Sequence, residues 1–351
     1  MQKIIQADQN VINEVERTKW KRSFQTLVKD WRLYVLLIPM LAFLICFKYL
    51  PIGGILLGFK FGDPNDAILK NDWCGLRWGE YIFVGQFADD FWRAFRNTFV
   101  NSMYGLLFGF PIPILLALLF SEIKNEKYRS VLQVCCYLPH FVSVVVVTQI
   151  IGLWVQGPIK LQNYPGGWLY QLMTNAGIND VEKSIYASSL MNSPKFFRPI
   201  YQISGVWEGA GYGSIVYFAA VMAISPTSYE AARIDGATKL QQIRYVTFPG
   251  MAPTLSIMLI MRIGQILNIG YEKVILLMGH GNGEYPYETA DVISSFVYRM
   301  SGRGGSSSDG SSGIVITQVG VVADLFNAII AMCLVLGANA ISRRVSSTSL
   351  F

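Results

Sequence analysis

The chain has few charged residues for its length. Of its 351 residues, 15% are charged and 52% are hydrophobic, whereas a soluble domain of this size carries about a quarter charged residues. Several apolar runs reach the roughly 20 residues that a helix needs to cross the hydrocarbon core of a bilayer. The composition argues against an ordinary soluble protein and predicts an all-α, polytopic membrane protein.

The sequence is also poor in the residues that catalytic and metal sites use. Its two histidines, His140 and His280, lie far apart, and four of its five cysteines lie inside apolar runs without disulfide or metal-ligand spacing. The chain has no Gly-Lys dipeptide, so it lacks a phosphate-binding loop. We therefore expect no enzyme, no metal and no nucleotide site on this chain.

Hydropathy predicts six membrane spans. They cover approximately residues 34–59, 98–120, 131–155, 199–224, 253–277 and 314–341. The first apolar run follows about 30 polar residues and is too long for the apolar core of a signal peptide, so it is expected to remain as a span. The prediction divides the chain into a tail (1–32), a transmembrane domain (33–345) and a short C-terminal end (346–351).

The distribution of lysine and arginine predicts the orientation. With an even number of spans, 15 of these residues fall in the two termini and the two short loops of one side, and 11 fall in the three much longer loops of the other side. The positive-inside rule places both termini in the cytoplasm. The net charge of +6 has the same origin, so we expect no nucleic-acid partner.

A stretch of almost pure glycine and serine, residues 301–313, precedes the last span. Its composition predicts a flexible outer loop. Such a loop is either a solvated tether or a segment that orders against an external partner.

The inner loop 225–250 carries the most informative pattern. Thr227 and Glu230 have the spacing of a capping box, which predicts that a helix begins there. Gly236 provides a position where that helix can end. A second helical stretch, 238–246, is predicted to end before Pro249. The pattern predicts a helix–turn–helix between the fourth and fifth spans.

This loop resembles the EAA loop of bacterial ABC importer permeases. Glu230-Ala-Ala is followed at the expected spacing by Gly236, Val246, Phe248 and Pro249; in the family, isoleucine and leucine are commoner at the Val246 and Phe248 positions. The resemblance implies that the short helix docks in a groove of an ATPase subunit. It implies coupling roles for Glu230, Ala231, Ala232, Asp235, Gly236 and Pro249.

Other segments are similar to the binding-protein-dependent sugar permeases, in particular to the subgroup that takes up complex oligosaccharides. They are Phe47–Pro51, Tyr137–Ser143 and Asp291–Arg299. The resemblance implies a type I ABC importer permease in a bacterial cell membrane. It further implies a heterodimer with a second permease, two ATPase subunits that bind ATP and Mg, an extracytoplasmic sugar-binding protein and alternating access.

Polar side chains inside the predicted spans are candidates for a translocation cavity, because such groups are costly in lipid and should face a cavity or one another. Amides and carboxylates suit sugar hydroxyls, and aromatic walls suit sugar ring faces. The candidates are Gln149, Trp207, Glu208, Tyr212, Arg262, Gln265, Asn268, Asp324 and Asn327. The alternative is structural: Arg262 pairs with Asp324 or Glu208, and the amides bond between helices.

The predicted spans also contain glycines and prolines with expected structural roles. Gly205, Gly209, Gly211 and Gly213 of the fourth span are expected to allow close helix packing rather than to contact substrate. Pro111 and Pro113 are expected to kink the second span. Other functions stay open at this point: an ABC permease for peptides, amino acids or phosphate, an ion-coupled sugar carrier, which should show internal repeats, or an intramembrane enzyme or receptor.

Overall fold

The structure is a computed structural model that describes residues 29–61, 70, 72–158, 164–178, 189–279, 287–300 and 313–345. Most of the predicted N-terminal tail, residues 301–312 of the predicted flexible loop and the end 346–351 lie outside the described residues. The chain forms two compact units, Met1–Leu56 and Leu57–Phe351, which are treated separately.

The first unit holds most of the first span. Helix α2 (Trp31–Leu44) continues into a π-helical turn, Ile45–Tyr49, and a 3-10 segment, Leu50–Phe59. Proline cannot donate a backbone hydrogen bond, and the wide turn directly before Pro51 is one way to accommodate it. The span Trp31–Phe59 confirms the predicted first span.

The second span of the chain consists of α4 (Ala88–Gly109) and α5 (Pro111–Glu122). The interruption falls at Phe110, directly before Pro111, as the two prolines predict. The helix begins ten residues earlier than the predicted 98. Phe91 and Ala94 extend it because both are buried against Trp78 and Ile82 of α3 (Arg77–Phe83), which holds the polar first turns in a helix.

The predicted third span, 131–155, is broken into two helices. Helix α6 (Glu126–Tyr137), a 3-10 turn (Leu138–Phe141) and α7 (Val144–Val155) are bent by 91°. Pro139 sits in the turn, and the Ser143 hydroxyl caps α7 by accepting from the Val145 amide at 3.4 Å. The segment Tyr137–Ser143 therefore forms the break between the two helices.

Helix α9 (Pro194–Met222) covers the predicted fourth span and packs against α4, α5, α6 and α12. By length and hydropathy it qualifies as a span together with the next helix, Pro226–Ile234, from which it is bent by 68°. Among its glycines, Gly211 allows the closest approach: a Cβ there would lie 1.9 Å from the Cys136 carbonyl oxygen of α6. At Gly209, by contrast, a Cβ would meet nothing within 4 Å. The predicted packing role is therefore seen at Gly211 but not at every glycine of the helix.

The fifth span lies further toward the N-terminus than predicted. It runs from Lys239 to Gly264 through α11 (Lys239–Gln242), a π-helical turn (Ile243–Thr247) and α12 (Phe248–Gly264). The apolar residues assigned to the end of the predicted span 253–277 form a separate helix, α13 (Tyr271–Met278). This helix packs on α7, and Val274 and Leu277 are fully buried there.

The remaining elements are short, apart from the sixth span. Strands β1 (Lys60–Phe61) and β2 (Asp72–Trp73) pair antiparallel, with Lys60 opposite Trp73. Helices α8 (Trp168–Asn175), α14 (Tyr287–Ala290) and α15 (Ile293–Met300), and a 3-10 turn at Leu190–Asn192, lie between the spans. Helix α16 (Gly313–Val345) contains the last candidate span, Thr317–Arg343.

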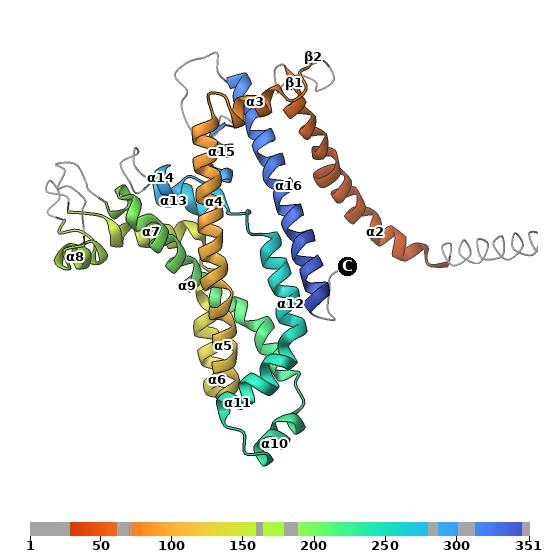
Figure 1. Cartoon of the computed structure of the whole chain (residues 1–351), viewed down its shortest axis with the longest axis vertical. Coiled ribbons are helices and arrows are strands. Elements are labelled where there is room, and N and C mark those ends of the chain that lie inside the picture. The colour runs from red at the N-terminus through yellow and green to blue at the C-terminus, as the bar shows by residue number, and fades with distance from the viewer. Residues whose placement is uncertain are drawn as a thin grey trace, which may run out of the picture. The chain divides into compact units, whose positions relative to one another are not determined.

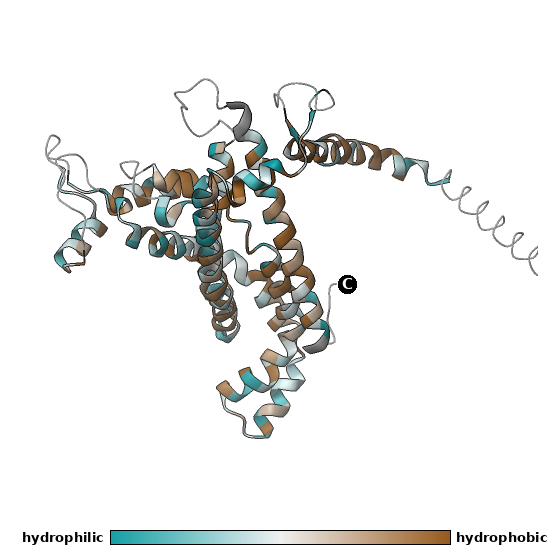
Figure 2. Cartoon of the chain, turned by 45° about the horizontal axis from the view of Figure 1, so that its top comes forward, coloured by the Kyte–Doolittle hydropathy of each residue, from teal (hydrophilic) through white to brown (hydrophobic). Residues whose placement is uncertain are grey.

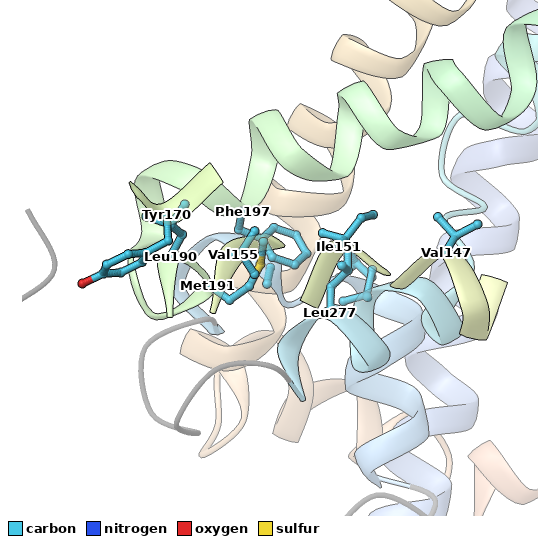
Figure 3. Packing of buried hydrophobic residues seen from close by; sticks show 11 residues of the cluster. Val147, Ile151, Val155, Tyr170, Leu190, Met191, Phe197 and Leu277 are labelled. Atoms are coloured by element: carbon cyan, nitrogen blue, oxygen red, sulfur yellow. The ribbon is translucent and has the colours of Figure 1, made fainter. Parts of the chain in front are cut away.

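Length and hydropathy give four spans, or six when the two bent helix pairs are each counted as one. The described residues are almost entirely helical, and the predicted all-α fold is confirmed. Hydrophobic residues cover much of these helices, whereas hydrophilic and neutral residues predominate in the loop that carries α10 and α11 (Figure 2). One buried cluster joins α7, α8, α9 and α13 through residues such as Ile151, Phe197 and Leu277 (Figure 3).

Candidate coupling and translocation sites

The predicted coupling helix is present as α10 (Pro226–Ile234). It begins one residue before the predicted Thr227, with Pro226 in its first turn. The Thr227/Glu230 capping box does not form, because the Thr227 hydroxyl bonds instead to that of Ser225 at 2.7 Å. Proline in the first turn needs no hydrogen-bond acceptor for its nitrogen and has the φ of a helix, so it starts the helix without that cap.

Gly236 ends this helix as predicted. Its φ is +76°, a conformation that costs other residues about 1–2 kcal/mol. The Ala237 amide donates to the Ala232 carbonyl at 2.9 Å, and the Gly236 amide donates to the Arg233 carbonyl at 3.0 Å. These are the two bonds of a Schellman motif, so a glycine at this position fixes the turn after α10.

A capping box does form at the next helix. The Thr238 amide donates to Gln241 Oε1 at 2.7 Å, and the Thr238 side chain caps the first turn of α11. Gln242 is buried and donates to the Ala237 carbonyl at 2.9 Å. The Tyr229 hydroxyl on α10 lies 3.1 Å from that of Thr247. The two short helices are thus tied into one helix–turn–helix.

The helix that follows does not end before Pro249, which corrects the prediction. Residues 243–247 adopt a π-helical turn, and α12 begins at Phe248 and continues through Pro249. Regular α-helical bonding would need an amide at Pro249 and would bring its ring against the preceding turn. The wider turn accommodates the proline, so the end of the loop is continuous with the fifth span.

The helix–turn–helix is exposed and lies at the end of the second unit opposite to α3 (Figure 1). None of the α10 residues is buried. Ile234 and Leu240 are 86% and 79% exposed, which is unusual for aliphatic side chains on a polar loop. Lys239 also reaches Glu122, at the end of α5, with Nζ 2.5 Å from Oε2. The loop therefore presents an apolar surface that the chain itself does not cover.

The predicted cavity residues of the fifth span lie at its end and not at its middle. Arg262 lies in the last turn of α12, and Gln265 and Asn268 lie in the turn that follows it, instead of at the middle of a span. All three side chains are exposed. The guanidinium of Arg262 reaches the crossing of α4 and α9, since a Cβ at Gly109 or Gly213 would lie 4.0 Å from one of its nitrogens.

The alternative pairing of Arg262 is not found. Among the described residues, Arg262 makes no ion pair with Asp324 or Glu208. The partner of Glu208 is Lys273 of α13, with Nζ 2.9 Å from Oε2. Lys273 also lies over the ring of Tyr201 at 5.6 Å. Lys273 was not predicted as part of this pair, because it lies inside the apolar run of the predicted fifth span and 65 positions from its partner.

The other candidates are scattered over three helices. Tyr212 of α9 stacks on His140 with ring centroids 4.0 Å apart, next to the break in the third span. Trp207 is 54% exposed, and Gln149 and Asp324 are also exposed. Asn327 is buried and donates to the Leu267 carbonyl at 3.4 Å, so it has a helix-packing role. Apart from the buried Asn327, these residues lie on exposed helix faces, and the single chain does not enclose them in one cavity.

A buried ionic cluster beside α15 was not predicted. Asp291 is fully buried, with Arg299 Nη2 2.5 Å from its Oδ2 and the Ser295 hydroxyl 2.7 Å from its Oδ1. Arg93 of α4 approaches to 3.9 Å. Burial raises the pKa of Asp291, and the charge of Arg299 opposes this shift. The cluster fixes α15 against α4.

Among the described residues, no group of three or more His, Cys, Asp or Glu side chains could hold a metal ion. All five cysteines are free thiols. The geometry is that of a polytopic helical subunit with an exposed helical loop on one end and polar side chains on exposed helix faces.

Comparison with known proteins agrees with a polytopic helical membrane subunit. Residues 109–347 match the family described as binding-protein-dependent transport system inner membrane component. The chain is 32% identical to protein LplB of Bacillus subtilis, over 93% of this chain and 92% of that protein. It is 31% identical to YteP, a polygalacturonan/rhamnogalacturonan transport system permease of the same organism, over 96% and 95%.

A solved structure resembles the whole chain. It is a chain of a bacterial ABC transporter involved in the import of the acidic polysaccharide alginate, with a TM-score of 0.74 and 36% identity, over 92% of this chain and 99% of that one. This chain therefore belongs to the binding-protein-dependent inner membrane component family and is an ABC importer permease subunit with the type I fold. As a transport subunit of this family it is not an enzyme.

Proposed function

We propose that this chain is a permease subunit through which an ATP-driven importer moves oligosaccharide from an extracytoplasmic binding protein into the cytoplasm. The observation that carries the proposal is the α10 loop. Its Schellman turn at Gly236 presents an uncovered helix with Ile234 86% exposed, which is the form that a helix-in-groove contact requires. The partner is an ATPase subunit, and ATP and Mg bind there rather than on this chain.

Within this loop, Ala231 and Ala232 let the helix approach its groove closely, and the exposed carboxylates of Glu230 and Asp235 face basic residues of the ATPase. Pro249 and the π-helical turn before it join the loop rigidly to α12. Movement of the ATPases is thereby passed to the fifth span. In this orientation both termini lie in the cytoplasm, in agreement with the positive-inside rule.

Two relatives support the carbohydrate substrate. YteP is a polygalacturonan/rhamnogalacturonan permease, and the alginate importer has also been solved with a periplasmic protein that carries an alginate pentasaccharide. The exposed polar residues Arg262, Gln265 and Asn268 need a partner surface to enclose them. A second, different permease would supply it, so that the sugar crosses between the two subunits.

The test is purification of the chain from native membranes in mild detergent, followed by mass spectrometry of whatever accompanies it. The comparison is between wild type, Gly236→Asp and the control Gly337→Ala, a position on α16 where a Cβ would meet nothing within 4 Å. We expect a second permease with all three proteins, and an ATPase with wild type and the control only. Recovery of a homo-oligomer without any ATPase would contradict the proposal and favour an ion-coupled carrier.

A further inference from the structure

A cavity of about 730 Å³ lies between the second span and the first half of α9. Its walls are mainly apolar: Tyr104, Phe108 and Ile112 come from α4 and α5, and Ile203 and Val206 come from α9. Ile203 is 70% exposed, so the cavity is an open groove on the helix surface. No residue of the translocation or coupling sites lines it.

Cationic groups gather at one end of this groove. Lys195 and Arg198 line it in the first turns of α9. Arg96 and the carboxylate of Glu288 also lie close enough to Arg198 to act on it electrostatically. The opposite end, toward Ile112 and Val206, is apolar.

The guanidinium of Arg198 is held in place by neutral groups. Its Nη2 donates to Asn97 Oδ1 at 2.8 Å. The Asn97 amide is oriented in turn, because its Nδ2 donates to the Glu288 carbonyl at 2.9 Å. Among the described residues Arg198 makes no ion pair, and its Nε is buried without a hydrogen-bond partner. The positive charge of Arg198 is therefore not neutralised by a directly bonded carboxylate and can attract an anion.

The length of the groove along α9 matches the thickness of one leaflet of a bilayer. From Lys195 to Val206 the helix rises about 16 Å, and half of a hydrocarbon core is about 15 Å thick. The stretch Ala88–Glu122 has 35 residues and is therefore about 52 Å long, longer than the core, so its first turns extend beyond it. Arg96 and Asn97 then fall near the level of lipid headgroups.

We propose that this groove binds an anionic phospholipid, with the phosphate at Arg198 and Lys195 and one acyl chain along Phe108, Ile112 and Ile203. The apolar walls disfavour a sugar, whose hydroxyls would find few partners there. A juxtamembrane cation attracts anionic lipid by about 1 kcal/mol, and an oriented guanidinium is well suited to phosphate.

The test uses the chain with its co-purifying partners, exchanged into detergent that contains equal amounts of phosphatidylglycerol and phosphatidylcholine. Native mass spectrometry then counts the lipids retained. We expect wild type to keep phosphatidylglycerol in preference, and Arg198→Gln to lower that preference about five- to tenfold. Ile203→Trp should reduce retention of both lipids. The control Leu119→Trp, on an exposed face of α5 outside the groove, should behave as wild type.

A second variant and a crosslinking experiment complete the test. If Arg198→Gln does not fold, Lys195→Gln is used, with a smaller loss of preference expected. A photo-crosslinking amino acid at position 203 should form an adduct with the mass of a phospholipid. An adduct with the second permease or with a sugar, or equal lipid retention in wild type and Arg198→Gln, would overturn the proposal.

Discussion

The carboxylate of Glu208 on α9 lies 2.9 Å from the ammonium group of Lys273 on α13. Their side chains are only 23% and 12% exposed, so this pair is partly withdrawn from water. It connects the fourth span to the short helix that follows the fifth span. The pair therefore holds α13 in the place where Val274 and Leu277 become buried.

We predict that Glu208→Gln lowers the stability of the chain by about 2 kcal/mol, because it leaves a partly buried ammonium group without its counter-ion. The double variant Glu208→Gln, Lys273→Met should recover most of this loss. The measurement is the thermal unfolding midpoint in detergent. The exposed pair of Glu122 and Lys239 gives the control: Glu122→Gln should cost less than about 0.5 kcal/mol. Equal losses in Glu208→Gln and Glu122→Gln would show that the Glu208 pair is unimportant.

Two glycines of α9 allow a matched test of helix packing. We predict that Gly211→Ala costs about 3 kcal/mol, because its Cβ would lie 1.9 Å from the Cys136 carbonyl oxygen and α6 would have to move. Gly209→Ala should be neutral or stabilising, because a Cβ there meets nothing within 4 Å and alanine favours helices. The yield of monodisperse protein in size-exclusion chromatography reports both. Similar yields for the two variants would contradict the close approach of α6 and α9.

The coupling loop shows what local sequence can predict. Its helix–turn–helix follows from short-range chemistry, because a helix that ends with a residue of positive φ favours glycine there, and Gly236 occupies that position. The position of its capping box was predicted wrongly because two threonines have the required spacing. Only Thr238 forms the box, whereas Thr227 follows a proline that already starts the helix.

The spans show where sequence reasoning fails. Hydropathy does not distinguish a side chain that faces lipid from one that packs against protein. Hydropathy assigns Val274 and Leu277 to the fifth span, although they are buried in a separate helix. The break at Pro139 was missed for the same reason, because apolar residues continue on both sides of it. Ion pairs such as Glu208 with Lys273 join distant parts of the chain and leave no local pattern.

The cluster around Asp291 predicts a second stability effect. Asp291→Asn should lower stability by about 2 kcal/mol, because Arg299 and Arg93 lose the carboxylate that they share. Asp90→Asn is the control: Asp90 also pairs with Arg93, but its side chain is 45% exposed, so its replacement should cost less than about 0.5 kcal/mol. Thermal unfolding distinguishes the two. A loss in Asp90→Asn as large as in Asp291→Asn would assign the effect to Arg93 instead of to the buried carboxylate.

Arg262 gives the sharpest test of the translocation site. Its guanidinium is exposed at the crossing of α4 and α9, and among the described residues it makes no ion pair. Arg262→Ala should therefore leave the folded chain and its partners intact. It should reduce uptake of the oligosaccharide by about tenfold or more, because a charged hydrogen bond to a sugar hydroxyl contributes about 1.5–3 kcal/mol.

Arg262→Lys separates charge from geometry at this position. Lysine keeps the positive charge but loses the planar fork of donors, so uptake should fall between wild type and Arg262→Ala. The readouts are the initial rate of uptake in cells and, in parallel, the amount of assembled complex in their membranes. An alanine variant that transports at the wild-type rate would remove Arg262 from the cavity. Loss of the assembled complex would make it a structural residue instead, so the two measurements together decide whether Arg262 contacts the sugar.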